Sequence, residues 1–180
     1  MASVEDLVPT IERCAHAIAD RLRAGGSALW FGNGGSATQA QHLATELLGR
    51  YELERRGFRS ISLTADTALI TAVANDYGFD TVFARQVEAL AGPGDVVIGL
   101  STSGNSPNVL QGIDAANHLG ALTVGLAGGD GGKLAQIVDM PIVVNHPRTA
   151  RVQEAHLFIG HALCEIVELT LAEGGNVRPT

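Results

Sequence analysis

The segment DVVIGLSTSGNSPNVL, residues 95–110, is the strongest indication of the fold of this chain. Residues 95–100 form its clearest apolar run, which is typical of a parallel strand that is covered on both faces. The run ends in a loop of Ser, Thr, Gly and Asn, and Pro107 then begins a helical pattern, at a position where proline is favoured. The segment therefore predicts a buried strand, a polar elbow and a helix in direct succession.

A similar succession occurs earlier, in WFGNGGSATQAQH at residues 30–42. We call its loop (32–35) the glycine elbow and the later loop (101–106) the serine elbow. Apolar runs predict strands at 27–31, 60–63, 95–100, 122–126 and 140–144. Helical patterns lie between them at 36–50, around 66–74, at 81–90 and at 107–120, and a short helix follows the glycine-rich turn at 127–133. Strands that alternate with helices predict an α/β fold, in which helices sandwich an open parallel β-sheet.

A single domain is expected over residues 1–180, because no linker or low-complexity segment divides the chain. It consists of a first helix at about 4–24, an α/β core at about 27–145 and a long closing helix at about 149–172. Both terminal helices have broad apolar stripes, which a single small sheet is not expected to cover fully. We therefore expect them to pack between the subunits of a homotetramer.

Composition limits the class of protein. A chain of 180 residues with 46% hydrophobic residues can bury a substantial core, and its net charge of −7 argues against a protein that coats nucleic acid. No apolar run reaches the ~20 residues that a membrane span requires, and the charged first segment does not resemble a signal peptide. We therefore expect a cytoplasmic protein with no nucleic-acid or membrane partner. Cys14 and Cys164 lie in apolar helical patterns and are expected to be buried free thiols.

The two elbows are candidate binding sites, because ligands of open α/β sheets lie beyond the carboxyl ends of the strands. The start of a helix offers free N–H groups and the positive end of the helix dipole, which favour an anion such as phosphate. In the serine elbow, hydroxyl donors surround Gly104: Ser101, Thr102, Ser103 and Ser106. The alternative is that these residues only cap helices and form turns. Neither elbow has the pattern of a P-loop or of a dinucleotide fingerprint.

Two of the predicted helices contain residues that suit a divalent metal ion. His42 and Glu46 are four residues apart, about 40° around the helix axis, and so share a face. Gln153 and His161 are eight residues apart in the closing helix, roughly 80° around its axis. Imidazole and carboxylate suit zinc or another divalent transition metal, whereas a Gln amide is a less usual ligand. The alternative is that these histidines are merely packed or solvated, as we expect for His156.

Several segments resemble the phosphoheptose isomerase family of sugar-isomerase (SIS) domains. They are FGNGGSATQAQHLATELLGRY (31–51), AVANDYGFDTVFARQVEAL (72–90), GDVVIGLSTSGNSPNVL (94–110) and ARVQEAHLFIGHALCEIVE (150–168). The resemblance implies a flavodoxin-like SIS-domain fold. It also implies an aldose–ketose isomerase that converts D-sedoheptulose 7-phosphate to D-glycero-D-manno-heptose 7-phosphate, the first step of ADP-heptose and lipopolysaccharide core precursor synthesis. One zinc ion per subunit, and a homotetramer with active sites at subunit interfaces, are further implications.

The resemblance also implies roles for individual residues. The substrate-binding set that it implies is Asn33, Gly34, Gly35, Ser36, Asn75, Asp76, Ser101, Thr102, Ser103, Ser106 and Gln153. Within this set the hydroxyl groups of the serine elbow hold the phosphate, and Asn75 and Asp76 lie near the sugar hydroxyls. The metal ligands that it implies are His42, Glu46, Gln153 and His161.

Glu46 and His161 suit the chemistry of aldose–ketose isomerisation. The reaction moves a proton between neighbouring carbons through an enediol, so it needs a base near the carbons and an acid–base group near the oxygens. It also needs stabilisation of negative charge on oxygen, which a metal ion or an array of donors supplies. We assign the base to Glu46 and the acid–base role to His161. A carboxylate that binds zinc tightly is a poor base, so either Glu46 leaves the metal when sugar binds or another group takes the proton.

Two other functions stay open at this level. A non-catalytic relative with the same fold associates with the replication initiator and does not retain the full acid–base set, whereas this chain has both Glu46 and His161. An isomerase of another phosphosugar is the second alternative. Ala150 occupies a position where some isomerases of the family have Asp, so one polar contact to the substrate is expected to be absent.

Overall fold

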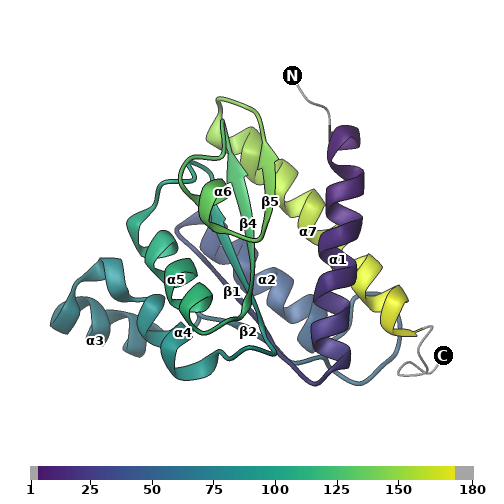
Figure 1. The fold of residues 1–180 in the computed structure, drawn as a ribbon, viewed down its shortest axis with the longest axis horizontal. Helices are drawn as coiled ribbons and strands as arrows, with labels where there is room; N and C mark the ends of the chain where they lie inside the picture. Colours follow the sequence, from purple (N-terminus) through teal and green to yellow (C-terminus); the bar gives the residue numbers. More distant parts are fainter. Residues whose placement is uncertain (1–3, 173–180) are drawn as a thin grey trace.

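The computed structural model describes residues 4–172, which form a five-stranded parallel sheet between two layers of helices (Figure 1). The strands are β1 (Ala28–Gly32), β2 (Ser60–Ser62), β3 (Val96–Ser101), β4 (Leu122–Gly128) and β5 (Met140–Val144). Their order in the sheet is β2-β1-β3-β4-β5, and every pairing is parallel. This is the doubly wound order of flavodoxin-like folds, so the α/β prediction is confirmed.

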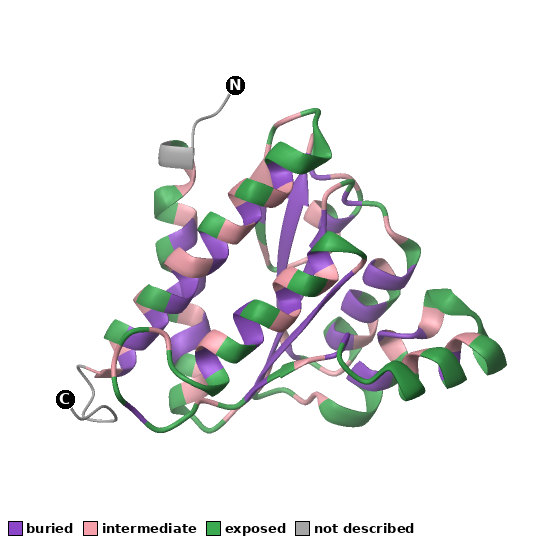
Figure 2. Cartoon of the chain, turned by 180° about the vertical axis from the view of Figure 1, so that it is seen from behind, coloured by how far each residue is buried: buried purple, intermediate pink, exposed green. Residues whose placement is uncertain are grey.

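Helices cover both faces of the sheet. They are α1 (Val8–Arg23), α2 (Gly35–Leu48), α3 (Thr67–Tyr77), α4 (Ala84–Leu90), α5 (Pro107–His118), α6 (Leu134–Ile137) and α7 (Thr149–Leu171), with 3-10 turns at Val4–Leu7 and Phe79–Thr81. One face is packed by α1, α2 and α7, and the other by α4, α5 and α6, while α3 projects from the side of the molecule. Figure 2 shows the result, in which the central strands are buried and the outer helix faces are exposed.

The buried strands are apolar because both of their faces are covered. In β1, Trp30 packs under α1, α2 and α7, whereas Leu29 and Phe31 point to the opposite face. The indole N–H of Trp30 donates to Ser60 Oγ at 3.0 Å, which satisfies its one polar atom in the core. Phe31 stacks on Phe83 with ring centroids 4.9 Å apart. Alternation of side chains in a central strand thus produces two separate apolar cores.

The first helix differs from its predicted bounds. The described residues begin with a 3-10 turn at Val4–Leu7, and α1 starts at Val8, because Pro9 is tolerated only in the first turn of an α-helix. The apolar side chains of α1, such as Ile11 and Ile18, are buried against α7 and the sheet. This stripe is therefore largely covered within one chain, whereas Val8 on α1 and both Phe158 and Leu169 on α7 are exposed. Packing of these helices between subunits stays a prediction.

The ends of other elements shift by a few residues. β4 runs to Gly128, two residues beyond its predicted end, and α2 ends at Leu48 rather than at residue 50. A Cβ atom on Gly128 would collide with the carbonyl group of Thr102 and with the side chain of Val152. The extra length of β4 therefore packs tightly against both the serine elbow and α7.

Both cysteines, Cys14 and Cys164, are buried and unpaired, as predicted. Burial raises the pKa of Cys14 to about 11 and that of Cys164 to about 12, so both are protonated thiols near neutral pH. Among residues 4–172, the structure contains no helix that is both long and apolar enough to cross a membrane.

Candidate active site

The two elbows lie side by side at one edge of the sheet. The glycine elbow follows β1, the serine elbow follows β3, and these two strands are neighbours. From β1 the chain continues to β2 on one side of this pair, whereas from β3 it continues to β4 on the other. This reversal of direction is the place where ligands bind in doubly wound folds. The elbows are therefore two walls of one site.

A pair of asparagines joins the elbows. Asn33 Nδ2 donates to Asn108 Oδ1, and Asn108 Nδ2 donates to Asn33 Oδ1, each at 2.8 Å. Asn108 is buried in the first turn of α5. Asn108 is not among the site residues predicted from the sequence. The available signal was a polar amide directly after Pro107, at a helix position that the structure shows to be buried.

Hydroxyl groups line a small cavity between the elbows. Ser101 Oγ lies 3.4 Å from Ser103 Oγ and 3.0 Å from Ser106 Oγ. The cavity has a volume of about 70 Å³ and is lined by Asn33, Ser36, Leu100, Ser101, Thr102, Ser106 and Gln153. Most of the expected substrate-binding residues thus come together here. Small-molecule sites usually measure ~300–1,000 Å³, so within one chain this cavity has room only for an anchoring group.

The cavity is suited to an anion despite its lack of basic side chains. Neither Lys nor Arg lines it. Ser106 is the N-cap residue of α5, and Ser36 lies in the first turn of α2, so two helix starts face the cavity. N–H groups and helix dipoles at such starts stabilise negative charge. Gly104 has φ of +64°, and a Cβ atom there would collide with the carbonyl group of Gly131, so the serine elbow requires glycine at this turn.

Gln153 reaches the cavity from α7. Its side-chain amide packs so closely on the glycine elbow that a Cβ atom at Gly35 would lie 2.5 Å from Gln153 Nε2. Its backbone oxygen accepts a hydrogen bond of 2.7 Å from Gln39 Nε2, which fastens α7 to α2. Gln153 precedes His161 by eight residues, or ~12 Å along a helix. Gln153 therefore stands at the cavity end of α7, two turns before His161.

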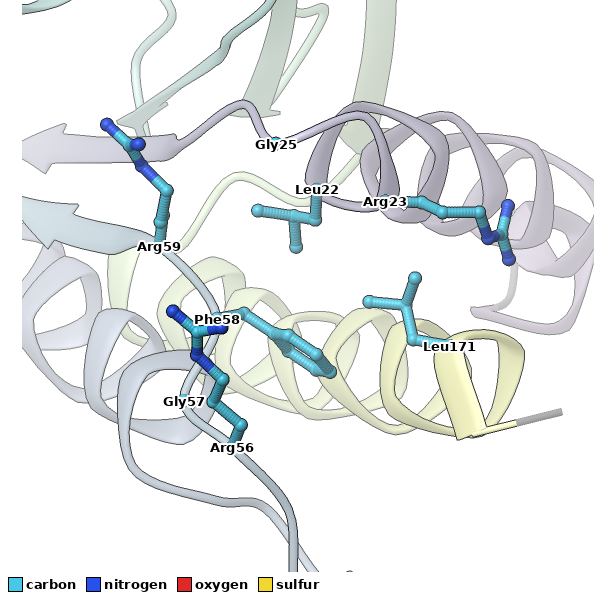
Figure 3. A pocket seen from close by; sticks show the side chains of 8 residues that line it. All are labelled: Leu22, Arg23, Gly25, Arg56, Gly57, Phe58, Arg59 and Leu171. Atoms are coloured by element: carbon cyan, nitrogen blue, oxygen red, sulfur yellow. The ribbon is translucent and has the colours of Figure 1, made fainter. Parts of the chain in front are cut away.

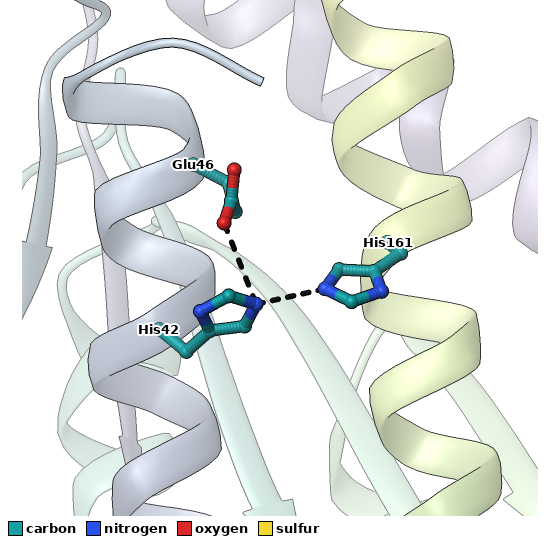
Figure 4. A group of neighbouring side chains, drawn as sticks. All are labelled: His42, Glu46 and His161. Carbon is teal, nitrogen blue, oxygen red and sulfur yellow. Dashed lines mark hydrogen bonds and ion pairs between the residues drawn. The ribbon is translucent and has the colours of Figure 1, made fainter. Parts of the chain in front are cut away.

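His42, Glu46 and His161 converge between α2 and α7 (Figure 4). His42 Nε2 lies 2.8 Å from His161 Nε2 and 3.4 Å from Glu46 Oε1. His42 and Glu46 share one face of α2, as their spacing predicts, and α7 brings His161 to the same place. The side chain of His42 is 44% exposed and that of Glu46 is 21% exposed, so solutes have access to the cluster.

The donor atoms of this cluster fit a divalent metal ion. One nitrogen from each imidazole and one carboxylate oxygen lie within 4.8 Å of one another. Ligand atoms in a tetrahedral zinc site with bonds of ~2.1 Å are about 3.4 Å apart. The distance between the His42 and Glu46 atoms is 3.4 Å. Two imidazoles and a carboxylate are also a donor set of catalytic zinc sites, which keep one position open. The chain thus brings three of the four expected ligands into one group.

Comparison with known proteins assigns this chain to a family. Residues 1–128 match the model of the SIS domain. The phosphoheptose isomerase of Geotalea daltonii is 52% identical over 167 residues, which cover 93% of this chain and 87% of that protein. The phosphoheptose isomerase of Aquifex aeolicus is 51% identical over 173 residues, which cover 96% of this chain and 91% of that protein. The chain belongs to the phosphoheptose isomerase family.

Solved structures of phosphoheptose isomerases have the same fold. The structure of phosphoheptose isomerase GmhA from Neisseria gonorrhoeae matches with a TM-score of 0.87 and 42% identity, over 92% of this chain and 88% of that one. The structure from Francisella tularensis matches with a TM-score of 0.87 and 40% identity, over 89% and 86% of the two chains. The resemblance seen in the sequence segments therefore extends through the whole fold.

Tyr51 is a second residue at the site that was not predicted from the sequence of this phosphoheptose isomerase family member. Its ring centroid lies 6.0 Å from that of His161. Burial, together with the nearby carboxylates of Glu165 and Glu52, raises the pKa of Tyr51. The phenol therefore stays protonated beside the cluster and remains a hydrogen-bond donor. Its place soon after the end of α2, within a segment that resembles the family, was the available signal.

Asn75 and Asp76 do not join the cavity or the His–Glu cluster within one chain. Both are exposed on α3, where Asn75 Nδ2 donates to Asp76 Oδ1 at 2.8 Å. α3 projects from the opposite side of the molecule to α7, and Val73 is its buried residue (Figure 1). Within one chain these two side chains therefore neither line the cavity nor belong to the cluster.

A separate cavity of about 260 Å³ lies at the other edge of the sheet (Figure 3). Leu22, Phe58 and Leu171 form its apolar part, with Arg56 and Arg59 at its border. It adjoins the amino ends of β1 and β2, whereas the elbows follow the carboxyl ends of their strands. None of the expected site residues lines it, so it is separate from the candidate active site.

Proposed function

We propose that the chain is an aldose–ketose isomerase that converts D-sedoheptulose 7-phosphate to D-glycero-D-manno-heptose 7-phosphate in the cytoplasm. The observation that carries the proposal is the convergence of Glu46 and His161, with His42, on the two helices that also border the hydroxyl-lined cavity. One end of the site suits a phosphate and the other suits proton transfer. The relatives named above are called phosphoheptose isomerases, which agrees with this chemistry.

The length of the site supports a seven-carbon substrate. On α2, Ser36 lines the cavity and His42 belongs to the cluster, six residues or ~9 Å further along the helix. On α7, Gln153 and His161 occupy the matching ends, ~12 Å apart. A sugar whose phosphate lies at the serine elbow must span this distance to place its C1–C2 bond at the cluster. An extended seven-carbon chain is about this long.

In the proposed reaction Glu46 takes a proton from C1 of the ketose and returns it to C2. His161 moves a proton from the C1 oxygen to the C2 oxygen, so that the ketone becomes an alcohol and C1 becomes an aldehyde. His42 Nε2 lies 2.8 Å from His161 Nε2, so His42 orients the ring that carries out this transfer.

The proposal includes one zinc ion per subunit, held by His42, Glu46 and His161. Gln153 lines the cavity in this structure, so it would become the fourth ligand only after its side chain has left the cavity. Such an ion supplies stabilisation of negative charge on the substrate oxygens. His42→Ala is expected to lower zinc occupancy, and His16→Ala, at an exposed position of α1, serves as the matched control. Metal analysis of the purified protein tests this. Absence of binding at micromolar zinc would remove the metal from the proposal and leave the isomerase activity to be tested.

The proposal also includes a homotetramer with active sites at subunit interfaces. The cavity of one chain holds an anchoring group at most, so further contacts to the sugar must come from elsewhere. α3 and the turn after it expose large apolar side chains, since Leu69 is 37%, Tyr77 62% and Phe79 54% exposed. Contact through this surface would bring Asn75 and Asp76 to a neighbouring site. Light scattering should give the mass of a tetramer, and a fully active monomer would contradict this part of the proposal.

The direct test is to incubate the purified protein with D-sedoheptulose 7-phosphate and to follow aldose formation, with and without added zinc. The unphosphorylated sugar is the matched control and should be a very poor substrate, because it lacks the group that the serine elbow binds. Equal turnover of both sugars would contradict the role of the elbow. No turnover of either would favour the alternative of a non-catalytic protein that associates with the replication initiator. Turnover of another phosphosugar alone would favour the second alternative.

A further inference from the structure

We propose that the buried ion pair between Arg55 and Glu168 is a positioning device that holds Glu46 and His161 at their working separation. The inference rests on the function proposed above. The two charged groups lie outside the cluster, and neither has a part in the proposed proton transfers. Their side chains are 0% and 2% exposed, and Arg55 Nε donates to Glu168 Oε1 at 2.6 Å.

Glu168 binds the loop that follows α2. Its Oε1 accepts from the N–H of Tyr51 at 3.0 Å, and its Oε2 accepts from the N–H groups of Glu52 at 2.7 Å and Leu53 at 2.8 Å. Glu168 itself belongs to α7. One carboxylate therefore fastens a whole turn of the loop to the helix that carries His161.

Arg55 binds the end of α2. Its Nη2 donates to the carbonyl oxygen of Glu46 at 2.8 Å, and its Nη1 donates to that of Leu47 at 2.9 Å and that of Gly49 at 3.3 Å. The last carbonyl groups of a helix have no partner within the helix, so the guanidinium group supplies one. The backbone of Glu46, which carries the proposed base, is thus bonded directly to the ion pair.

The ion pair is the last of several contacts that join α2 to α7 along their length. Gln39 bonds to the backbone of α7 near the cavity, and Leu43 packs on Gly160, where a Cβ atom would collide with its side chain. The His–Glu cluster lies beyond these contacts, and the ion pair closes the far end. Glu168 follows His161 by seven residues, which returns to nearly the same face of α7.

Stability by itself is a weak reason for such a pair. Removing two charges from water costs about as much as their attraction returns, so apolar side chains of similar volume often stabilise a fold equally well. A guanidinium group and a carboxylate instead fix direction, because both form several bonds in set geometry. The bonds here run to backbone groups on both sides of the cluster. This arrangement therefore sets the distance between α2 and α7.

The test uses Arg55→Lys, which keeps the charge but loses the planar fork, and Glu168→Gln, which keeps the shape but loses the charge. We expect each to bind Co²⁺, added to metal-free protein, about 10–100-fold more weakly than wild type, as for other groups that orient metal ligands. We expect kcat to fall by a similar factor while KM changes little, because the serine elbow is untouched. Gly160→Ala should have the same effect by pushing the helices apart.

The matched control is Glu54→Gln, in the same loop. Glu54 is exposed and lies 3.9 Å from Arg50, so its loss should change neither Co²⁺ affinity nor kcat. Urea unfolding of each variant confirms that the protein assayed is folded. If folded Arg55→Lys and Glu168→Gln bind Co²⁺ and turn over substrate like wild type, the pair has only a structural role and the proposal is wrong.

A measurement on the wild type tests the proposal even if the variants do not fold. Coupling between two sites is reciprocal, so metal bound at the cluster should slow amide hydrogen exchange at Tyr51, Glu52 and Leu53. Unchanged exchange at these amides would overturn the proposal. Failure of the isomerase function is distinguishable from failure of this proposal. If wild type binds Co²⁺ but turns over no sugar phosphate, Co²⁺ affinity still tests the role of the ion pair. If wild type turns over substrate without metal, kcat and KM of the variants test it.

Discussion

Asn33 and Asn108 exchange two hydrogen bonds of 2.8 Å across the gap between the glycine and serine elbows. Each side-chain amide uses one donor and its oxygen acceptor in this exchange. Asn33 follows β1, and Asn108 lies at the start of α5, so the pair sets the distance between two elements that border the cavity. A cavity that binds a phosphate through neutral donors depends on such a fixed distance, because the donors must already be in position before the phosphate binds.

Asn108→Ala should therefore weaken both the fold and substrate binding. The half-buried amide of Asn33 loses its partner, which costs ~0.5–1.5 kcal/mol for each of the two hydrogen bonds. Urea unfolding should show this loss, and KM should rise while kcat changes less. Asn117→Ala, at the far end of α5, is the matched control and should leave KM unchanged. An Asn108→Ala protein with the KM of wild type would show that the pair does not shape the cavity.

Ser101→Ala should mainly weaken binding of the phosphorylated substrate. Ser101 is buried at the end of β3. The substitution removes one hydroxyl donor to the charged phosphate, and such a hydrogen bond contributes ~1.5–3 kcal/mol to binding. Ser103→Ala should act in the same direction. Titration with the substrate, or KM, measures the effect, and Thr10→Ala on α1 is the control. Binding at wild-type strength by both variants would place the phosphate elsewhere.

Glu46→Gln should abolish most turnover without unfolding the protein. The amide keeps the size of the side chain but is not a base, and general acid–base groups contribute ~10²–10⁴-fold to rate. His161→Gln should have a similar effect. The double variant should be little worse than either single one, because groups that act as a unit are not additive. Initial rates of aldose formation measure all three.

Solvent deuterium gives an independent check on these two residues. Wild type should incorporate deuterium at the carbon next to the carbonyl, unless the proton passes between carbons without exchange. Near-normal turnover by Glu46→Gln would show that another residue is the base.

The stability of the protein should fall in acid in a way that depends on Glu168. Burial opposes ionisation of its carboxyl group, but hydrogen bonds from Leu53, Glu52, Tyr51 and Arg55 outweigh burial and lower the pKa of Glu168 from 4.5. A lowered pKa in the folded state means that the ionised group stabilises the fold above the unfolded value. This contribution is lost as the pH falls below about 4.5 and through the lower pKa of the folded state.

Urea unfolding of wild type and Glu168→Gln, from about pH 7 down to about pH 3, measures this contribution. Wild type should be the more stable protein at neutral pH, and the difference should shrink in acid, because the variant has no proton to gain at this position. A difference that stays constant with pH would show that the charge of Glu168 does not support the fold.

The local elements could be predicted from sequence because their signals are local. The apolar run at 95–100 and the loop after it predict a buried strand and an elbow wherever the strand lies in the sheet. The four-residue spacing of His42 and Glu46 predicts a shared face of one helix, and the structure has it. The ends of elements were less certain, because packing decides them: the extension of β4 to Gly128 depends on contacts with the serine elbow and α7.

The tertiary structure alone decided which of these elements meet. His42 and His161 are 119 residues apart in sequence, and Arg55 and Glu168 are 113 apart. Asn33 and Asn108, which join the two elbows, are 75 apart. Periodicity reports which face of a helix or strand is apolar, but it contains no information on which strand lies beside β1. That order follows from the packing of whole helices on both faces of the sheet, and it is what turns two polar elbows and two helix faces into one site.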